Sequence, residues 1–252
     1  MFSCIAFTPV DLQYYMMRYI IKLINLLFVF SVPLLLITFT LALIANIPPL
    51  YEYEFNKYDV GSYTVGDFRN LNDLELRIIA SSIPAYFNSG GAEEPIRLII
   101  RGKELFNEKE KVHMVDVKKL VRLDYLILLI TSSFLAAYTV AKALFFSKLG
   151  WRPYFLRALM GAGITLGLII ITGLMLVFNF EGFFLAFHLV SFTNTLWILD
   201  YATDNLINLF PSGFFFDAAL LIAILIALEA LALTVVSVRF LLTTRRVRAR
   251  VR

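Results

Sequence analysis

Residues 183–216, FFLAFHLVSFTNTLWILDYATDNLINLFPSGFFF, separate two apolar segments that are each long enough to cross a membrane. This stretch holds His188, one of the two histidines of the chain, among apolar and aromatic residues. The other histidine, His113, lies in NEKEKVHMVDVKKLVR, residues 107–122, directly before a different apolar segment. We predict that the two stretches meet on one side of a membrane and form a single site.

The composition is that of an integral membrane protein. Of the 252 residues, 60% are hydrophobic and 15% aromatic, and the mean hydropathy of +0.77 is far above that of a soluble domain. The single cysteine, Cys4, excludes an intramolecular disulfide framework and a cysteine-cluster metal site. We therefore expect an integral membrane protein, and we predict that it uses no metal and no other cofactor.

The hydrophobic pattern predicts an all-α membrane protein with four transmembrane helices, forming a single integral membrane domain over residues 1–252. The first apolar segment is too long for a signal-peptide core and lacks a small-x-small cleavage site, so we expect it to stay uncleaved. The expected spans cover about residues 19–45, 125–146, 158–178 and 215–240.

The distribution of basic residues predicts the orientation. Residues 147–157 contain lysine and arginine but no acid, and the tail 241–252 is rich in arginine. Residues 179–214 contain acids but no lysine or arginine. By the positive-inside rule, 147–157, 241–252 and both termini are cytoplasmic in a cell membrane, while 47–122 and 179–214 are extracytoplasmic. Both histidines are thereby predicted on the extracytoplasmic face.

Residues 47–122 are predicted to form an extracytoplasmic mini-domain, and residues 179–214 an interfacial helical segment. Asn72-x-x-Glu75 is a capping pattern at the start of a helix, and residues 96–106 resemble a short hairpin around Arg101-Gly102. Asn107-x-x-Glu110 is a second capping pattern, whose helix can continue without a breaker into the second span.

The helix after Asn107 carries the first candidate site residues. Glu110, His113 and Asp116 recur every three residues and share one face, and a basic run follows at the level of the lipid headgroups. The alternative is that Glu110 is a capping residue, His113 a solvated surface histidine and the basic run a membrane anchor. The basic run consists of Lys118, Lys119 and Arg122.

The stretch around His188 carries the second group of candidates. The aromatic neighbours of His188 indicate an interfacial or buried helix, where an imidazole needs a partner. The alternative is a structural histidine beside an aromatic belt, with the polar residues after it as helix caps. In either case we expect the phenylalanines to contact the bilayer. The polar and aromatic candidates that follow are Asn194, Trp197, Asp200 and Asp204.

These residues resemble the bacterial lipoprotein intramolecular transacylases over nearly the whole chain, including the order of the four spans. The likeness rests on two blocks, one around each histidine, and Tyr201 stands where the family's proline is expected. The motifs are Glu110-x-x-His113-x-x-Asp116-Val117-Lys118, then Phe187-His188, then Asn194-x-x-Trp197-x-x-Asp200-x-x-x-Asp204, then Phe210-Pro211.

The resemblance implies an enzyme of the outer face of the bacterial cytoplasmic membrane. It would move the sn-2 acyl chain of a diacylglyceryl-cysteine lipoprotein to the α-amino group of that cysteine, giving an N-acyl lyso-form lipoprotein. The implied partners are the lipid bilayer and this lipoprotein, with no nucleic acid. His113 and His188 would be the catalytic groups, and the expected substrate-binding residues are Lys118, Lys119, Arg122, Asn194, Trp197, Asp200 and Asp204.

The chemistry of such a transfer fits two histidines. An amine that attacks an ester needs a base, a donor for the tetrahedral oxyanion and an acid for the leaving alkoxide, and an imidazole can serve as base or acid near neutral pH. We expect His113 as base, oriented by Asp116 or Glu110, and His188 as acid or oxyanion donor. The two roles can also be exchanged.

Two other functions compete with acyl transfer. A metal-dependent membrane lipid hydrolase would use both histidines, Asp116 and Glu110 as ligands, but two histidines are few for zinc and no His-Glu-x-x-His motif occurs. A non-catalytic accessory protein or small transporter would carry polar residues throughout its spans. Here Glu229 and Lys142 are nearly the whole set, and we expect them to pair with each other.

Overall fold

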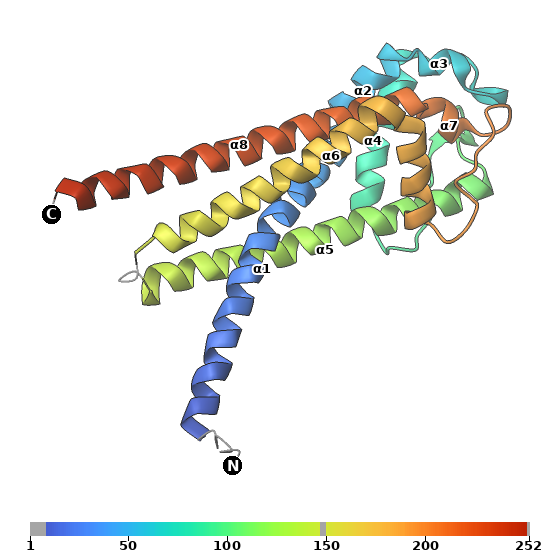
Figure 1. Cartoon of the computed structure of the whole chain (residues 1–252). Coiled ribbons are helices and arrows are strands. Elements are labelled where there is room, and N and C mark those ends of the chain that lie inside the picture. The colour runs from blue at the N-terminus through green and yellow to red at the C-terminus, as the bar shows by residue number, and fades with distance from the viewer. Residues whose placement is uncertain (1–8, 147–149, 251–252) are drawn as a thin grey trace.

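The computed structural model describes residues 9–146 and 150–250, and most of them are helical (Figure 1). Four long helices form a bundle, and short helices with a two-stranded hairpin gather at one of its ends. In chain order the elements are α1 (Pro9–Ala45), α2 (Pro48–Lys57), α3 (Val60–Tyr63), the 3₁₀ helix η1 (Gly66–Phe68), α4 (Asp73–Asn88), β1 (Ile99–Ile100), β2 (Lys103–Glu104), α5 (Glu108–Phe145), α6 (Arg152–Ser191), α7 (Asn205–Leu209) and α8 (Ser212–Arg250).

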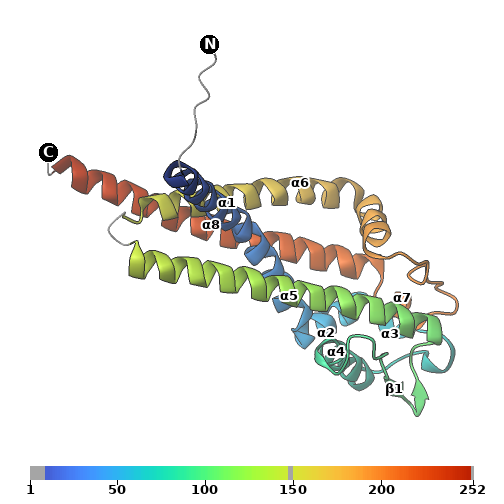
Figure 2. The ribbon, with the colours of Figure 1, turned by 90° about the horizontal axis from the view of Figure 1, so that it is seen from below.

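The four long helices confirm the predicted fold class. Each contains a segment that is long and apolar enough to cross a membrane, within 13–45, 108–145, 152–191 and 212–244. In the bundle α6 lies along α8, and α1 packs against α5 and α6 (Figures 1 and 2). The part of each helix that lies in the bilayer stays a prediction from the sequence.

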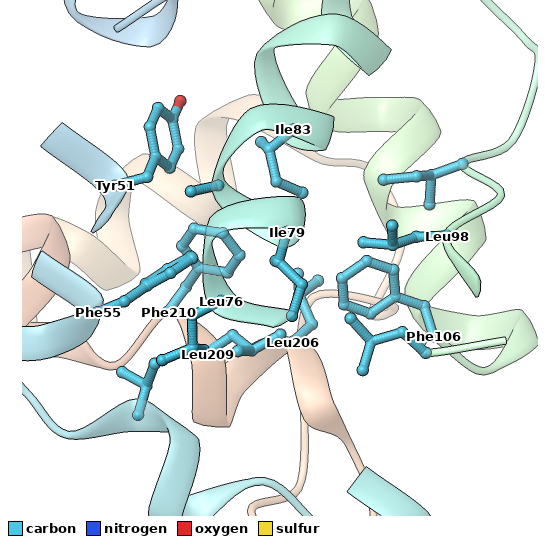
Figure 3. Close-up of a cluster of buried hydrophobic side chains, with 14 of the residues drawn as sticks. Tyr51, Phe55, Leu76, Ile79, Ile83, Leu98, Phe106, Leu206, Leu209 and Phe210 are labelled. Atoms are coloured by element: carbon cyan, nitrogen blue, oxygen red, sulfur yellow. The ribbon is translucent and has the colours of Figure 1, made fainter. Parts of the chain in front are cut away.

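A separate apolar core lies beyond the bundle, among α2, α4, the hairpin and α7 (Figure 3). Phe55 and Ile79 are fully buried there, and so is Leu209 of α7, which comes from the connector between α6 and α8. We call residues 48–107 together with α7 the cap. Because α7 contributes to this core, burial of its apolar side chains anchors the connector that follows His188.

The local features predicted for the cap are present. Capping boxes form at Asn72 with Glu75 and at Asn107 with Glu110, and the second box begins α5, which continues without interruption to Phe145. The β1–β2 turn is made by Arg101 and Gly102, with φ of 51° and 76°. The Arg101 guanidinium donates to both carboxylate oxygens of Glu75, at 2.7 and 2.8 Å, and so ties the hairpin to α4.

Helix α6 is interrupted at Asn179, which has non-helical φ and ψ of −156° and 65°. The Asn179 Oδ1 accepts a hydrogen bond from the Gly182 backbone N–H at 3.0 Å, so Asn179 caps a new helical segment. We call residues 180–191 the distal segment. Figures 1 and 2 show that it leaves the line of α6 and turns toward α5. The break at Asn179 directly follows residue 178, where the sequence predicts that the third span ends.

The predicted pairing of Glu229 with Lys142 is wrong. Glu229 Oε2 on α8 accepts a hydrogen bond from the Thr40 hydroxyl of α1 at 3.2 Å. The Lys142 ammonium instead donates to the carbonyl oxygen of Phe146 and lies over the ring of Trp151. The carboxyl group was assigned to the wrong neighbour because the pairing of helices across the bundle does not follow from the pattern of one helix.

Candidate active site

The distal segment and the start of α5 bring the two histidines together. The ring centroids of His113 and His188 are 6.4 Å apart, with the planes 26° from parallel. His113 is 6% exposed and His188 is 9% exposed. The two imidazoles, 75 residues apart in sequence (188 − 113), therefore form one buried pair, as the sequence predicted.

His188 is held in one tautomer by its own helix. Its Nδ1 lies 2.8 Å from the carbonyl oxygen of Phe184, and because a carbonyl can only accept, Nδ1 carries the hydrogen. In the neutral ring Nε2 is then the basic nitrogen. Burial lowers the pKa of His188, and the hydrogen bond to Phe184 opposes this shift.

His113 lacks the polar contact that its burial calls for. Its Nδ1 is buried and has no hydrogen-bond partner among the residues that the structure describes. Burial lowers the pKa of His113 to about 4, with the neighbouring His188 acting in the same direction and Asp116 opposing it. The ring is therefore neutral near pH 7, and its buried nitrogen is available to a ligand.

Aromatic rings surround the pair. Phe184 and Trp197 lie 4.4 and 4.9 Å from the His188 ring, and Phe192 lies 5.0 Å from the His113 ring. The sequence interpretation of the phenylalanines as bilayer contacts is thus wrong for Phe192, which is buried. Apolar walls of this kind limit the access of water and strengthen electrostatic interactions inside the site.

Asp116 connects α5 to the connector after the distal segment. Its Oδ2 accepts a hydrogen bond from the Asn194 side chain at 2.8 Å, and the Asn194 backbone oxygen accepts from Trp197 Nε1 at 2.9 Å. This chain of contacts positions the indole ring against His188. Asp116 acts on His113 through its charge, which favours the protonated ring.

Glu110 does not orient His113, contrary to one of the two alternatives drawn from the sequence. Its Oε1 accepts from the Leu206 backbone N–H at 2.5 Å and its Oε2 from the Asn107 backbone N–H at 2.7 Å. Burial raises the pKa of Glu110, and these backbone hydrogen bonds oppose the shift. Both carboxylate oxygens are therefore engaged in joining the start of α5 to α7.

Asp204 completes this junction. We call Asn107, Lys109, Glu110, Asp204 and Leu206 together the clamp. The Asn107 side chain donates to Asp204 Oδ1 at 2.9 Å, and the Lys109 ammonium and the Asp200 backbone N–H donate to Asp204 Oδ2 at 3.2 and 2.8 Å. Burial alone would raise the pKa of Asp204, but these hydrogen bonds outweigh it and lower the pKa. With these bonds Asp204 holds the connector against the start of α5. Asn107 and Lys109 were not predicted as its partners, because both lie far from Asp204 in the sequence.

A turn at Asp200 leads into the clamp. The Asp200 carbonyl oxygen accepts from the Thr203 and Asp204 backbone N–H groups at 3.2 and 2.8 Å. The Asp200 side chain accepts from the Ala202 N–H at 2.9 Å. The turn therefore forms with Tyr201 in place of the proline expected from the resemblance.

The basic run does not behave as one group. Lys118 is 0% exposed, and its ammonium lies 4.3 Å from the centroid of the Tyr86 ring and 3.3 Å from the Ser89 hydroxyl. Arg122 donates to the Ser89 carbonyl oxygen at 2.6 Å, at the end of α4. Headgroup contact by Lys118 is thus contradicted by its burial, whereas Lys119 keeps an exposed side chain 3.6 Å from Glu93.

The described residues contain no group of three or more histidine, cysteine, aspartate or glutamate side chains arranged to hold a metal ion. The surroundings of the two histidines are the aromatic rings described above, and the charge of Asp116 acts on His113.

Comparison with known proteins decides the family. Residues 26–215 match the family model described as lipoprotein intramolecular transacylase Lit. The chain belongs to this family. A curated relative from Aquifex aeolicus, described as an uncharacterized protein, is 26% identical over 206 residues, which are 81% of this chain and 88% of the relative. With its four long apolar helices, this chain is an integral membrane protein that crosses the bilayer more than once, and the solved Lit from Bacillus cereus is likewise described as membrane integral.

Solved structures of Lit from Bacillus cereus have the same fold. One, determined in meso, has a TM-score of 0.75 at 19% identity and covers 91% of this chain and 99% of that chain. A form of that protein in which one histidine is replaced by alanine has a TM-score of 0.71 at 19% identity, covering 93% of this chain and 99% of that chain.

Proposed function

We propose that this protein transfers the sn-2 acyl chain of a diacylglyceryl-cysteine lipoprotein to the α-amino group of the same cysteine. The observation that carries the proposal is the buried pair of imidazoles, with one nitrogen of His113 left without a partner. Family membership supports the reaction class, and the aromatic walls suit a lipid substrate. The site faces the extracytoplasmic side, with both termini cytoplasmic, on the argument from basic residues.

In this reaction the α-amino nitrogen attacks the carbonyl carbon of the sn-2 ester, and its proton passes to Nε2 of His188. The tetrahedral intermediate then loses the glycerol oxygen, which takes a proton back from His188 as the C–O bond breaks. Neutral His113 donates an N–H to the oxyanion. This exchanges the two roles first expected, because the Phe184 carbonyl fixes the tautomer of His188.

Both reacting groups belong to one substrate, so the protein needs no nucleophile of its own. Holding an amine and an ester in contact removes much of the entropic cost of the reaction. Asp116, Asn194 and Trp197 maintain the aromatic wall beside His188 by their hydrogen bonds. We assign these three residues a positioning role, and the clamp residues a structural one.

The test is mass spectrometry of a synthetic diacylglyceryl lipopeptide incubated with the purified protein in phospholipid vesicles. Transfer within one molecule leaves the mass unchanged, and fragmentation then locates the acyl group on nitrogen instead of on the sn-2 oxygen. Release of free fatty acid would favour a hydrolase. An unaltered lipopeptide, with the protein folded and inserted, would contradict the proposal and favour the accessory-protein alternative.

A further inference from the structure

The N-terminal part of α1 leaves the bundle. Every residue from Gln13 to Ile24 is exposed, whereas Phe28 is buried and packs against side chains of α5 and α6. Figure 1 shows this part of α1 running steeply across the direction of α5, α6 and α8, at the end of the bundle away from the cap, and Figure 2 shows it foreshortened. We call residues 13–24 the N-terminal segment. No described part of the chain buries any of its faces.

A polar network marks the level at which the segment leaves the bundle. Arg157 Nη1 donates to the Tyr138 hydroxyl at 3.1 Å, and that hydroxyl donates to Asn25 Oδ1 at 2.8 Å. Arg157 directly precedes the predicted third span 158–178, and a charged side chain at the end of a span lies at the level of the headgroups. Asn25 therefore lies close to the cytoplasmic headgroups.

The rest of α1 is long enough to cross the membrane without the N-terminal segment. Residues 26–45 number 20 (45 − 26 + 1) and are all helical. Twenty helical residues extend about 30 Å, which is the usual thickness of the hydrocarbon core. The span can therefore end at Asn25, where the helix leaves its neighbours.

The N-terminal segment is amphipathic. Arg18, Lys22 and Asn25 follow at intervals of four and three residues and so form one polar stripe along the helix. Tyr14 and Tyr15 border this stripe on its two sides, and tyrosine is enriched where a membrane meets water. The face opposite the stripe carries Met16, Met17, Ile20, Leu23 and Ile24. A helix with this pattern is typical of one that lies along a membrane surface.

The two cations of the stripe have no acidic partner. In the described part of the chain neither Arg18 nor Lys22 takes part in a salt bridge, and the Lys22 ammonium lies 5.6 Å from the centroid of the Tyr19 ring. The cytoplasmic leaflet carries anionic lipids, which attract lysine and arginine at its surface. The charge that complements the stripe is therefore that of lipid phosphates.

We propose that the N-terminal segment binds the surface of the cytoplasmic leaflet, with its apolar face at the upper ends of the acyl chains and with Arg18 and Lys22 on the phosphates of anionic phospholipids. The first span then begins at about residue 26 instead of residue 19. The family match also begins at residue 26, so this surface lies outside the matched region. The inference does not depend on the acyl-transfer reaction.

The first test measures the depth of each residue of the segment in the bilayer. In a Cys4→Ser background, single cysteines at positions 13–27 carry a nitroxide, and the protein is placed in vesicles of phosphatidylcholine and phosphatidylglycerol. The accessibility of each nitroxide to oxygen and to a water-soluble nickel chelate gives its depth. Depth should rise and fall about every 3.6 residues, with positions 18 and 22 shallow and positions 16, 20 and 23 deep.

Three other outcomes of this measurement overturn the inference. Depth that changes in one direction by about 1.5 Å per residue identifies a continuous span. Nickel accessibility that is high at every position places the segment in water. Spin–spin broadening with low oxygen accessibility on the apolar face identifies a contact between two copies of the chain.

The second test asks whether the stripe selects anionic lipid. Phosphatidylglycerol and phosphatidylcholine, each with a diazirine close to the headgroup, are photo-crosslinked in vesicles, and crosslinks within residues 13–28 are counted by mass spectrometry. Arg18→Gln and Lys22→Gln should each lower the ratio of phosphatidylglycerol to phosphatidylcholine crosslinks by about fivefold, the usual effect of one cation near an anionic surface. The matched control removes two exposed cations of the cap, by Arg69→Gln with Arg97→Gln, and should leave the ratio unchanged. An unchanged ratio in the Arg18→Gln, Lys22→Gln double variant would overturn the phosphate contact.

Discussion

The histidine pair and the clamp lie one helical turn apart at the start of α5, and they use their polar atoms in opposite ways. In the clamp, Glu110 and Asp204 direct every carboxylate oxygen to a donor of the protein. In the pair, His113 Nδ1 is buried and lacks a partner within the described residues. Because a buried polar group without a hydrogen bond is costly, its retention indicates a use outside the folded chain itself.

The hydrogen bonds distinguish the roles of three residues that the sequence pattern did not distinguish. Glu110, His113 and Asp116 share one helix face and looked like one catalytic group. Their partners differ: Glu110 binds backbone N–H groups, Asp116 binds Asn194, and His113 meets His188. Among these three residues, His113 has the buried polar atom without a hydrogen-bond partner in the described structure, and we therefore assign the reaction to His113.

The largest effect is expected at the pair. His113→Ala and His188→Ala should each reduce N-acyl product by roughly 10²- to 10⁴-fold, the usual loss when an acid, base or oxyanion donor is removed. The reaction is followed by fragmentation mass spectrometry of the lipopeptide, and thermal unfolding in detergent shows that each variant is folded. If both folded variants transfer the acyl chain at the wild-type rate, the histidine pair is not catalytic and does not differ in function from the clamp.

The clamp should respond in stability rather than in rate. Glu110→Ala leaves the buried N–H group of Leu206 and the partly buried N–H group of Asn107 without an acceptor, which should cost about 2–4 kcal/mol of unfolding free energy. The folded fraction should keep its rate per molecule within about threefold, an amount that corresponds to less than 1 kcal/mol.

The matched control for this variant is Glu108→Ala. Glu108 lies in the same helical turn, and its side chain is 88% exposed in a salt bridge with Lys111. Its removal should change stability by less than about 0.5 kcal/mol. Thermal and denaturant unfolding in detergent compare the two variants. A Glu110→Ala protein that is as stable as Glu108→Ala but catalytically dead would return Glu110 to the active site.

The sequence predicted the four apolar helices, both capping boxes, the hairpin and the meeting of His113 with His188. These follow from local signals: hydropathy, Asn-x-x-Glu spacing and the distribution of basic residues. The clamp and the burial of Lys118 depend on how α4, α5 and α7 pack, and no local pattern carries that information. The break of α6 did have a signal, since Asn179 and Gly182 interrupt an apolar run as a cap and a small residue.

The smallest effect is expected inside the bundle, where Glu229 resembles the clamp because it has a partner. Its hydrogen bond with Thr40 joins α8 to α1, and such bonds between membrane helices contribute about 0.6 kcal/mol on average. Thr40→Val should therefore lower the unfolding free energy by about that amount, and Glu229→Gln should change it less, because the amide oxygen still accepts from the threonine hydroxyl. Both should keep the wild-type rate of acyl transfer. A double-mutant cycle between the two positions, read by unfolding in detergent, measures the coupling. Loss of transfer in stable Glu229→Gln would contradict the rule that a satisfied polar group is structural, and would make the span itself part of the reaction path.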